Sequence, residues 1–210
     1  MTPEVKICGL TRAEDVEAAI AHGADYLGFI VKAKSSRRLS VAEAARLARP
    51  AKGIIPRVAV TVNEEAQTIA RIMSDMQPDY IQFHGDESPE HIAEIAKTYR
   101  VKTIKALPIA AADDLLSAMA FSGFVDLLLF DARPPKGEAQ RGGHGLSFDW
   151  DILKGAPLPK TWLLAGGLNS ENVGNALATG APILDVSSGV ESVPGVKDHE
   201  KIETFIQCLH

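Results

Sequence analysis

Two side chains that can transfer protons stand at the ends of short apolar runs. Cys8 closes VKIC (5–8), just before a glycine and a helix-like segment, and Asp131 closes VDLLLFD (125–131). A thiolate favoured by a nearby helix N-terminus can act as a base. A carboxyl group among apolar residues is costly unless it meets a partner or does chemistry, and it suits a general acid. The alternatives are a small buried hydrophobe for Cys8 and a helix cap or arginine partner for Asp131.

A basic segment and a histidine follow two other apolar runs. Arg37 and Arg38 lie in KSSRR (34–38), after YLGFIV (26–31), and His84 follows DYIQF (79–83). A planar guanidinium can hold a carboxylate or phosphate with two parallel hydrogen bonds, although a solvated basic loop fits the sequence equally well. His84 can orient a substrate or the thiol, or be structural. The other histidines do not fall at neighbouring positions, so we expect no metal site.

Small residues follow the last two apolar runs. Gly166 and Gly167 end WLLAG (162–166) and its turn, and ILDVS (183–187) leads into Ser187, Ser188 and Gly189. A phosphate cradle needs backbone N–H groups that approach the anion with no side chain in the way. The two segments therefore predict a phosphate site and a phosphorylated small molecule as the ligand. The alternative is ordinary turn glycines and helix-capping serines.

Eight β-branched or aliphatic runs alternate with Ala- and Glu-rich segments of helical spacing. The runs are VKIC (5–8), YLGFIV (26–31), PRVAVTV (56–62), DYIQF (79–83), VKTIKAL (101–107), VDLLLFD (125–131), WLLAG (162–166) and ILDVS (183–187). Seven helices are clear between and after them, and a shorter one is expected after FDW (148–150). Each unit has roughly 26 residues, room for a strand, a helix and two tight loops.

Strict alternation of strand and helix implies parallel strands with right-handed crossovers. Eight units predict an α/β fold, a single-domain (β/α)8 TIM barrel over residues 1–210, in which catalytic groups lie at the C-terminal ends of the strands. Cys8, Asp131 and the small-residue loops would then face one mouth. An open doubly wound sheet is the alternative. The longest irregular stretch, residues 132–147, follows the sixth run and is expected to be functional.

Composition excludes several classes of protein. Hydrophobic residues make up 46% and the net charge is −5, which argues against disorder and against nucleic-acid binding. Cys8 and Cys208 form no disulfide framework, and no run approaches the roughly 18 apolar residues of a membrane helix. The N-terminus lacks the pattern of a signal peptide. We therefore expect a cytoplasmic protein without nucleic-acid or membrane partners.

Taken together, the motifs resemble those of the phosphoribosylanthranilate isomerase family of tryptophan biosynthesis. The match runs in order through KICGLT (6–11), GFI (28–30), SSRRLS (35–40), QFHGDE (82–87), LLFD (128–131), GGHGLSFDW (142–150), AGGLNSENV (165–173), DVSSGVE (185–191) and PGVKD (194–198). The resemblance implies a small TIM barrel that converts N-(5-phosphoribosyl)anthranilate to 1-(2-carboxyphenylamino)-1-deoxyribulose 5-phosphate by an Amadori rearrangement, without a cofactor.

The resemblance also implies roles for single residues. Cys8 would be the general base, Asp131 the general acid, and Arg37, rather than the adjacent Arg38, the partner of the anthranilate carboxylate. The glycines of AGGL and the SSG segment would hold the phosphate. At the end of the eighth run, Asp185 is predicted to orient the substrate's amine or hydroxyl, and His84 to bind substrate. His144 stands where the family pattern has a small hydroxyl residue.

Other functions remain compatible with parts of the pattern. They are another phosphate-binding barrel, such as indole-glycerol-phosphate synthase, and an aldolase-like barrel with Lys6 or Lys105 as a Schiff-base lysine. A non-catalytic sensor of a phosphorylated metabolite would have no use for both Cys8 and Asp131. The sequence is compatible with a monomer or a homodimer.

Overall fold

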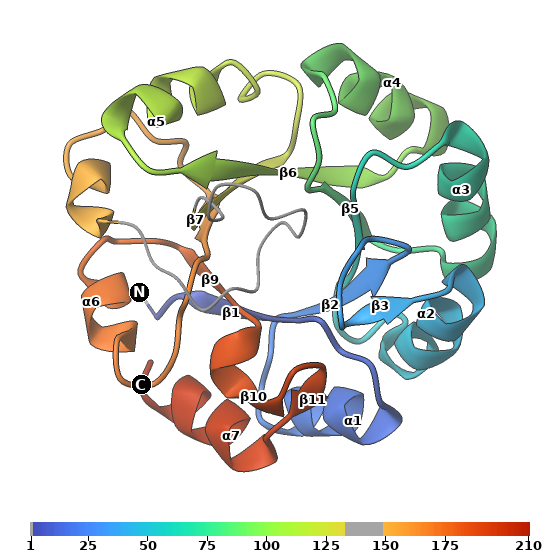
Figure 1. Cartoon of the computed structure of the whole chain (residues 1–210), viewed down its shortest axis with the longest axis horizontal. Coiled ribbons are helices and arrows are strands. Elements are labelled where there is room, and N and C mark those ends of the chain that lie inside the picture. Colours follow the sequence, from blue (N-terminus) through green and yellow to red (C-terminus); the bar gives the residue numbers. More distant parts are fainter. Residues whose placement is uncertain (1, 133–148) are drawn as a thin grey trace.

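The computed structural model describes residues 2–132 and 149–210. Eight parallel strands close into a barrel, because β1 pairs with β2 on one side and with β9 on the other. The closed ring, visible end-on in Figure 1, confirms the predicted barrel and shows that the open sheet was wrong. Its strands are β1 (Glu4–Cys8), β2 (Tyr26–Val31), β4 (Arg57–Thr61), β5 (Tyr80–Phe83), β6 (Lys102–Ile109), β7 (Leu127–Ala132), β8 (Trp162–Leu164) and β9 (Ile183–Val186).

Helices surround the barrel as an outer ring (Figure 1). They are α1 (Ala13–Ala21), α2 (Val41–Ala48), α3 (Ala66–Arg71), α4 (Pro89–Tyr99), α5 (Ala112–Met119), α6 (Val173–Leu177) and α7 (His199–Gln207). The short helix expected after FDW is the 3₁₀ turn η3 (Trp150–Leu153). A π turn, η2 (Ile72–Met76), continues α3, and two 3₁₀ turns, η1 (Arg49–Ala51) and η4 (Ser188–Val190), complete the helical elements among the described residues.

Three short strands lie outside the barrel wall. The two-residue strand β3 (Arg38–Leu39) pairs with the end of β2. An antiparallel hairpin of β10 (Glu191–Val193) and β11 (Val196–Lys197) precedes α7. All three stand beside the mouth of the barrel, where they bring additional charged side chains close to the strand ends.

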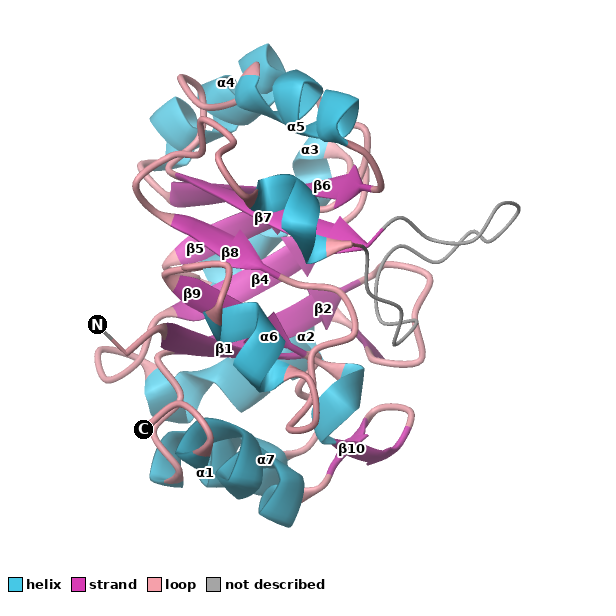
Figure 2. Cartoon of the chain, turned by 90° about the vertical axis from the view of Figure 1, so that its left-hand side faces the viewer, coloured by secondary structure: helices cyan, strands magenta, loops and turns pink. Residues whose placement is uncertain are grey.

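Apolar side chains form two separate clusters because strand residues alternate between the two faces of the wall. The larger cluster fills the layer between barrel and helices, with Phe29, Phe130 and Leu164 facing Val16 and Phe205. The smaller cluster fills the barrel interior and comprises Cys8, Val58, Val60, Tyr80, Ile104, Ala106, Leu127, Leu129, Leu163, Ala165 and Ile183. Seen from the side, the barrel is a tilted wall of strands between helical layers (Figure 2). The barrel interior below the C-terminal strand ends is therefore filled with packed side chains.

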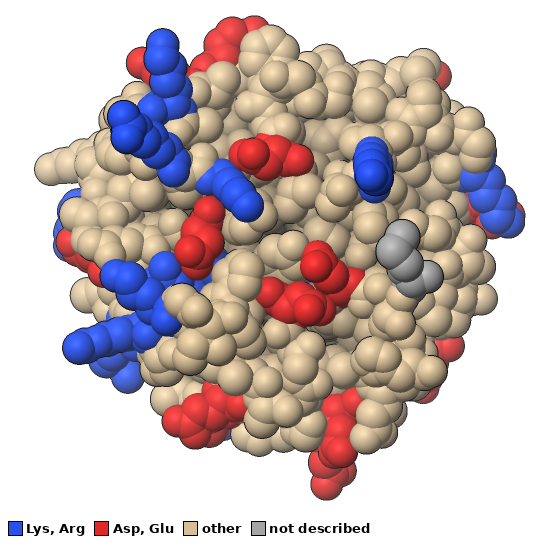
Figure 3. Space-filling model, turned by 180° about the vertical axis from the view of Figure 1, so that it is seen from behind, with Lys and Arg blue, Asp and Glu red and all other residues tan. Residues whose placement is uncertain are grey.

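Aspartates stabilise the opposite end of the barrel. Three aspartates, each directly before a strand, accept a hydrogen bond from a backbone N–H near the start of the neighbouring strand. The pairs are Asp25 with Val5, Asp79 with Arg57 and Asp126 with Thr103, at 2.7–2.8 Å. Figure 3 shows acidic side chains near the centre of this face. These bonds satisfy backbone donors that the barrel ladder leaves unpaired. These contacts stabilise the fold and take no part in chemistry, because catalytic groups in this fold lie at the other end.

Within the described ranges, every helix is too short or too polar to cross a lipid bilayer.

Candidate active site

Cys8 lies on the inner wall of the barrel, at the top of β1. Its side chain is buried, with 6% of the residue exposed, and Lys6 lies below it on the same face with no exposure. Lys6 Nζ pairs with Asp185 Oδ1 of β9 at 2.8 Å. Burial raises the pKa of the Cys8 thiol, and the Lys6 ammonium opposes that shift. The lysine beneath the thiol, more than any helix N-terminus, is thus the group that favours a thiolate.

Asp131 faces the interior at the top of β7, next to His84. Asp131 Oδ2 lies 3.3 Å from His84 Nε2, and its Oδ1 accepts a hydrogen bond from the Ala132 N–H at 2.9 Å. Gln82 Nε2 lies 3.3 Å from His84 Nδ1. An amide that donates to Nδ1 leaves Nε2, the ring nitrogen that faces Asp131, to carry the imidazole proton. His84 thus contacts Asp131 directly, and its predicted role in orienting substrate or the thiol stays a prediction.

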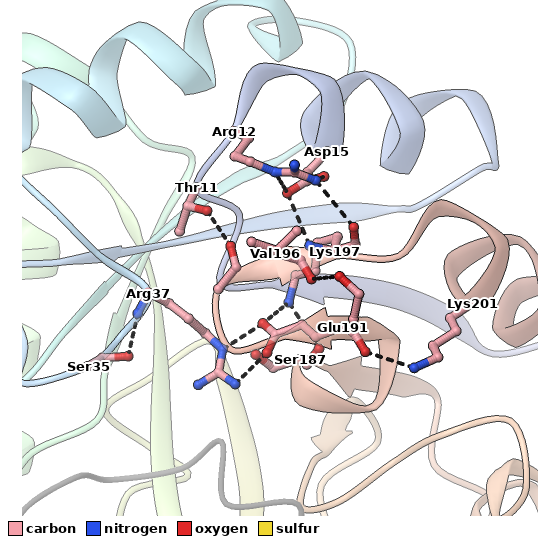
Figure 4. A network of polar contacts seen from close by, with 12 residues as sticks. Thr11, Arg12, Asp15, Ser35, Arg37, Ser187, Glu191, Val196, Lys197 and Lys201 are labelled. Carbon is pink, nitrogen blue, oxygen red and sulfur yellow. Dashed lines mark hydrogen bonds and ion pairs between the residues drawn. The ribbon is translucent and has the colours of Figure 1, made fainter.

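Arg37 reaches the mouth from the segment after β2 and is buried, with 3% exposed, whereas Arg38 is exposed. Arg37 Nε and Nη2 donate to the two carboxylate oxygens of Glu191, each at 2.7 Å. Lys197 Nζ lies 2.8 Å from Glu191 Oε1 (Figure 4). The solvated-loop interpretation is therefore wrong for Arg37, and the structure places this arginine, not its neighbour, beside the barrel mouth.

The two small-residue loops pack directly against each other. A Cβ at Gly189 would lie 1.8 Å from the Leu168 carbonyl oxygen, so only glycine fits there. Gly166 and Gly167 both have positive φ, 93° and 67°. In the described part of the chain, no group accepts from the N–H of Gly166, Gly167 or Ser188. The loops thus leave backbone donors available for an anion.

Three further predicted residues, Lys105, His144 and Asp185, differ in where they lie. Lys105 faces the helical layer, where its Nζ contacts Glu87 Oε2 at 2.8 Å and the Gly85 carbonyl at 2.7 Å, which removes it as a Schiff-base candidate inside the barrel. His144 lies outside the described residues. Asp185 is at the mouth, but its carboxylate is paired with Lys6.

Glu191 and Lys197 are part of the site, although the sequence analysis assigned them no role. Both stand within motifs of the resemblance, DVSSGVE and PGVKD. The available signal was a charged residue directly after a valine in each motif, VE (190–191) and VK (196–197). A charged residue needs a partner of opposite charge if it is buried, and Glu191 and Lys197 are such partners for each other.

Comparisons with known proteins agree with this arrangement. Residues 5–208 match the family model described as N-(5'phosphoribosyl)anthranilate (PRA) isomerase. The N-(5'-phosphoribosyl)anthranilate isomerase of Mesorhizobium japonicum is 46% identical over 210 residues, covering 100% of this chain and 96% of the relative. That of Parvibaculum lavamentivorans is 44% identical, covering 99% and 98%.

Solved structures give the same result. The phosphoribosyl anthranilate isomerase of Thermotoga maritima superposes with a TM-score of 0.87 at 36% identity, covering 99% of this chain and 98% of that one. A phosphoribosyl anthranilate isomerase in complex with reduced 1-(o-carboxyphenylamino)-1-deoxyribulose 5-phosphate has a TM-score of 0.84 at 36% identity, covering 98% and 97%. Full-length matches of sequence and fold show that the chain belongs to the phosphoribosylanthranilate isomerase family, isomerases of tryptophan biosynthesis.

Proposed function

We propose that this chain converts N-(5-phosphoribosyl)anthranilate to 1-(2-carboxyphenylamino)-1-deoxyribulose 5-phosphate, with Asp131 as general acid and Cys8 as general base. The observation that carries the assignment of roles is their placement. Both side chains face the barrel interior at the C-terminal ends of β1 and β7, on strands separated around the wall by β8 and β9. An acid and a base held on different strands can address different atoms of one sugar.

The first step is opening of the furanose ring. Asp131 donates a proton to the ring oxygen, the C1–O bond breaks, and the nitrogen lone pair forms an iminium with C1. The hydrogen bond to Asp131 from the Ala132 N–H and the contact with His84 Nε2 at 3.3 Å hold the carboxyl group in one orientation. Orientation of this kind keeps the proton in line with the leaving oxygen.

The second step is proton removal from C2. The iminium nitrogen withdraws electrons, so the C2–H bond becomes acidic and the Cys8 thiolate takes its proton. The C2–H electron pair forms the enolamine, which tautomerises to the aminoketose. Because the substrate supplies its own electron sink, the chemistry needs no cofactor. Lys6 supports the thiolate by its positive charge, against the burial that raises the pKa of Cys8.

Binding groups stand on both sides of this pair. Arg37 is the proposed partner of the anthranilate carboxylate, and the loops with Gly166, Gly167, Ser187, Ser188 and Gly189 are proposed to hold the phosphate. Asp185 Oδ1 is paired with Lys6 Nζ at 2.8 Å. We propose that its second oxygen orients the substrate's amine or hydroxyl.

The test is consumption of freshly prepared phosphoribosylanthranilate, followed by its fluorescence. Wild type should turn over rapidly, and C8A and D131N should each lose about 10²- to 10⁴-fold in kcat, the range for a positioned proton-transfer group. C208A is the matched control, because Cys208 is exposed in the last helical turn and should retain wild-type turnover. No turnover by folded wild type would overturn the function; turnover unaffected in C8A or D131N would overturn that residue's role.

A further inference from the structure

The guanidinium of Arg37 has two edges that can each bind a carboxylate, and one is already occupied. Nε and Nη2 form the side-on edge, and both donate to Glu191 at 2.7 Å. Nη1 with the second N–H of Nη2 forms the end-on edge. Nothing in the described part of the chain accepts from Nη1, and Figure 4 shows this nitrogen pointing away from Glu191.

Glu191 is itself held firmly in place. Its side chain and that of Arg37 are each only 4% exposed. Lys197 Nζ contacts Glu191 Oε1 at 2.8 Å, and the two residues are register partners in the β10–β11 hairpin. Lys201 Nζ donates to the Glu191 backbone carbonyl at 2.9 Å. A carboxylate fixed by two cations and by a hairpin can serve as a rigid anchor for the arginine.

The path of Arg37 is equally constrained. A Cβ at Gly9 would lie 2.5 Å from Arg37 Cδ, so the arginine stem crosses directly over the backbone that follows Cys8. Gly9 also has φ +76°, a conformation that favours glycine. The guanidinium therefore lies close to the thiol, and its charge and that of Cys8 interact. The side chain of Arg37 is therefore fixed by packing over Gly9 and by its hydrogen bonds to Glu191.

Lys197 connects this anchor to the phosphate loop. Its Nζ donates to the Ser187 carbonyl at 3.0 Å as well as to Glu191. Glu191 thus stands between the residue proposed to meet the substrate's carboxylate and a loop proposed to meet its phosphate. A displacement of Glu191 would change the separation of these two anion sites.

We propose that Glu191 is a positioning residue that determines specificity for the ring carboxylate of the substrate, by occupying the side-on edge of Arg37 so that only the end-on edge is presented to the ligand. This inference rests on the proposed function. An arginine whose orientation is set before binding loses less side-chain freedom when the carboxylate arrives. Without Glu191, the guanidinium would rotate, and the carboxylate would contribute less to binding.

The test compares two ligands that differ only in the carboxylate. They are reduced 1-(o-carboxyphenylamino)-1-deoxyribulose 5-phosphate, which a related isomerase binds, and the same compound with an unsubstituted phenyl ring. The discrimination ratio is Kd of the phenyl compound divided by Kd of the carboxyphenyl compound, measured by calorimetry. Damage to the phosphate site or to the fold raises both Kd values and leaves the ratio unchanged, so the ratio isolates carboxylate recognition.

Wild type should show a ratio well above one, and R37M should reduce it to near one. E191Q should reduce it about tenfold or more, as expected when a charge-assisted hydrogen bond is lost or misdirected. Glutamine has an NH2 donor in place of one of the two carboxylate oxygens, so the two parallel hydrogen bonds from Arg37 Nε and Nη2 cannot both form. D79N is the control: it removes the carboxylate of another arginine pair, Arg57–Asp79 at 3.0 Å, at the opposite end of the barrel, and should leave the ratio unchanged.

E191Q leaves Lys197 without its buried anion, which can prevent folding. The double variant E191Q/K197M removes one charge of each sign, and its ratio should fall as in E191Q. An unchanged ratio in either folded variant would overturn the role of Glu191. Wild type that turns over substrate with a ratio near one would overturn it too, while leaving the proposed function intact. Wild type with neither turnover nor binding would overturn the proposed function instead.

Discussion

Gly28 lies directly opposite Cys8 across the first two strands, and the absence of a side chain there makes room for the thiol. The two residues are register partners, and a Cβ at Gly28 would lie 2.8 Å from Cys8 Sγ and 3.0 Å from Cys8 Cα. These contacts are too short for carbon against sulfur or carbon. Gly28 thus shapes the position of the proposed base, although it carries no functional group.

The first prediction is that G28A displaces the thiol and lowers kcat in a protein that still folds. Overpacking of this kind costs about 1–3 kcal/mol of folding free energy, and a misplaced base costs about 10²-fold or more in rate. G174A is the control, because a Cβ at Gly174 in α6 meets nothing within 4 Å. G28A with wild-type turnover would show that the thiol need not occupy its observed position.

The second prediction concerns the charge of Lys6. In a C208S background, alkylation of Cys8 by iodoacetamide should rise with pH, since the thiolate is the reactive form and burial raises its pKa. Removing the ammonium in K6M should move this profile to higher pH, slowing alkylation at fixed pH by roughly tenfold per unit of pKa.

K6M also leaves Asp185 as an unpaired negative charge, which itself disfavours the thiolate. K6M/D185N separates the two effects and should lie between wild type and K6M. The matched control is K105M, which removes an equally buried lysine on the outer face of the wall. Its alkylation profile should be unchanged, and a profile that moves as far as that of K6M would contradict the assignment.

The third prediction is that His84 acts through Asp131. H84A should lower kcat about 10- to 100-fold, the effect of losing one polar contact to a charged group, with a smaller change in KM. In D131N the same substitution should cost little more, because residues that act as a unit are not additive. Full additivity in the H84A/D131N double variant, measured in the fluorescence assay, would place His84 on the substrate instead.

Features of this site that depend on residues of a single strand can be predicted from the sequence, whereas features that depend on contacts between distant segments cannot. The eight apolar runs are visible in the residues of single strands, and each run overlaps a strand of the barrel. The run at 101–107 extends to Ile109 in β6, because Pro108 and Ile109 pair with Asp131 and Ala132 of the next strand. That extension depends on a neighbour and not on the residues of the strand itself.

The Arg37–Glu191 pair could not be predicted from local pattern. The two residues are 154 positions apart, and either one alone is typical of a solvated loop. The strands β3, β10 and β11 have two or three residues each, too few for a periodicity to emerge. Their existence depends on packing beside the barrel mouth. Lys105 illustrates the converse: its residue type suggested chemistry, but its place on the outer face of β6 makes it structural.

The fourth prediction concerns acid stability and the turn that carries His84. Glu87 accepts hydrogen bonds from Lys105 Nζ at 2.8 Å, the Asn63 N–H at 2.8 Å and the Gly85 N–H at 2.9 Å. Burial alone would raise the pKa of Glu87, but these partners, Lys105 first, lower it below its ordinary value. A carboxyl group with a lowered folded-state pKa stabilises the fold above its unfolded pKa of about 4.3, and this contribution is lost as pH falls through the folded value.

E87Q should therefore lower the free energy of unfolding at pH 7 by about 3–5 kcal/mol, since it leaves Lys105 buried without its anion. The difference from wild type should shrink as the pH falls below about 4, where wild-type Glu87 becomes protonated as well. Urea unfolding at several pH values measures it. The control is E94Q on the exposed face of α4, expected within about 0.5 kcal/mol of wild type at every pH. A difference between E87Q and wild type that does not change with pH would contradict this prediction. It would show that the charge of Glu87 does not contribute to the free energy of unfolding.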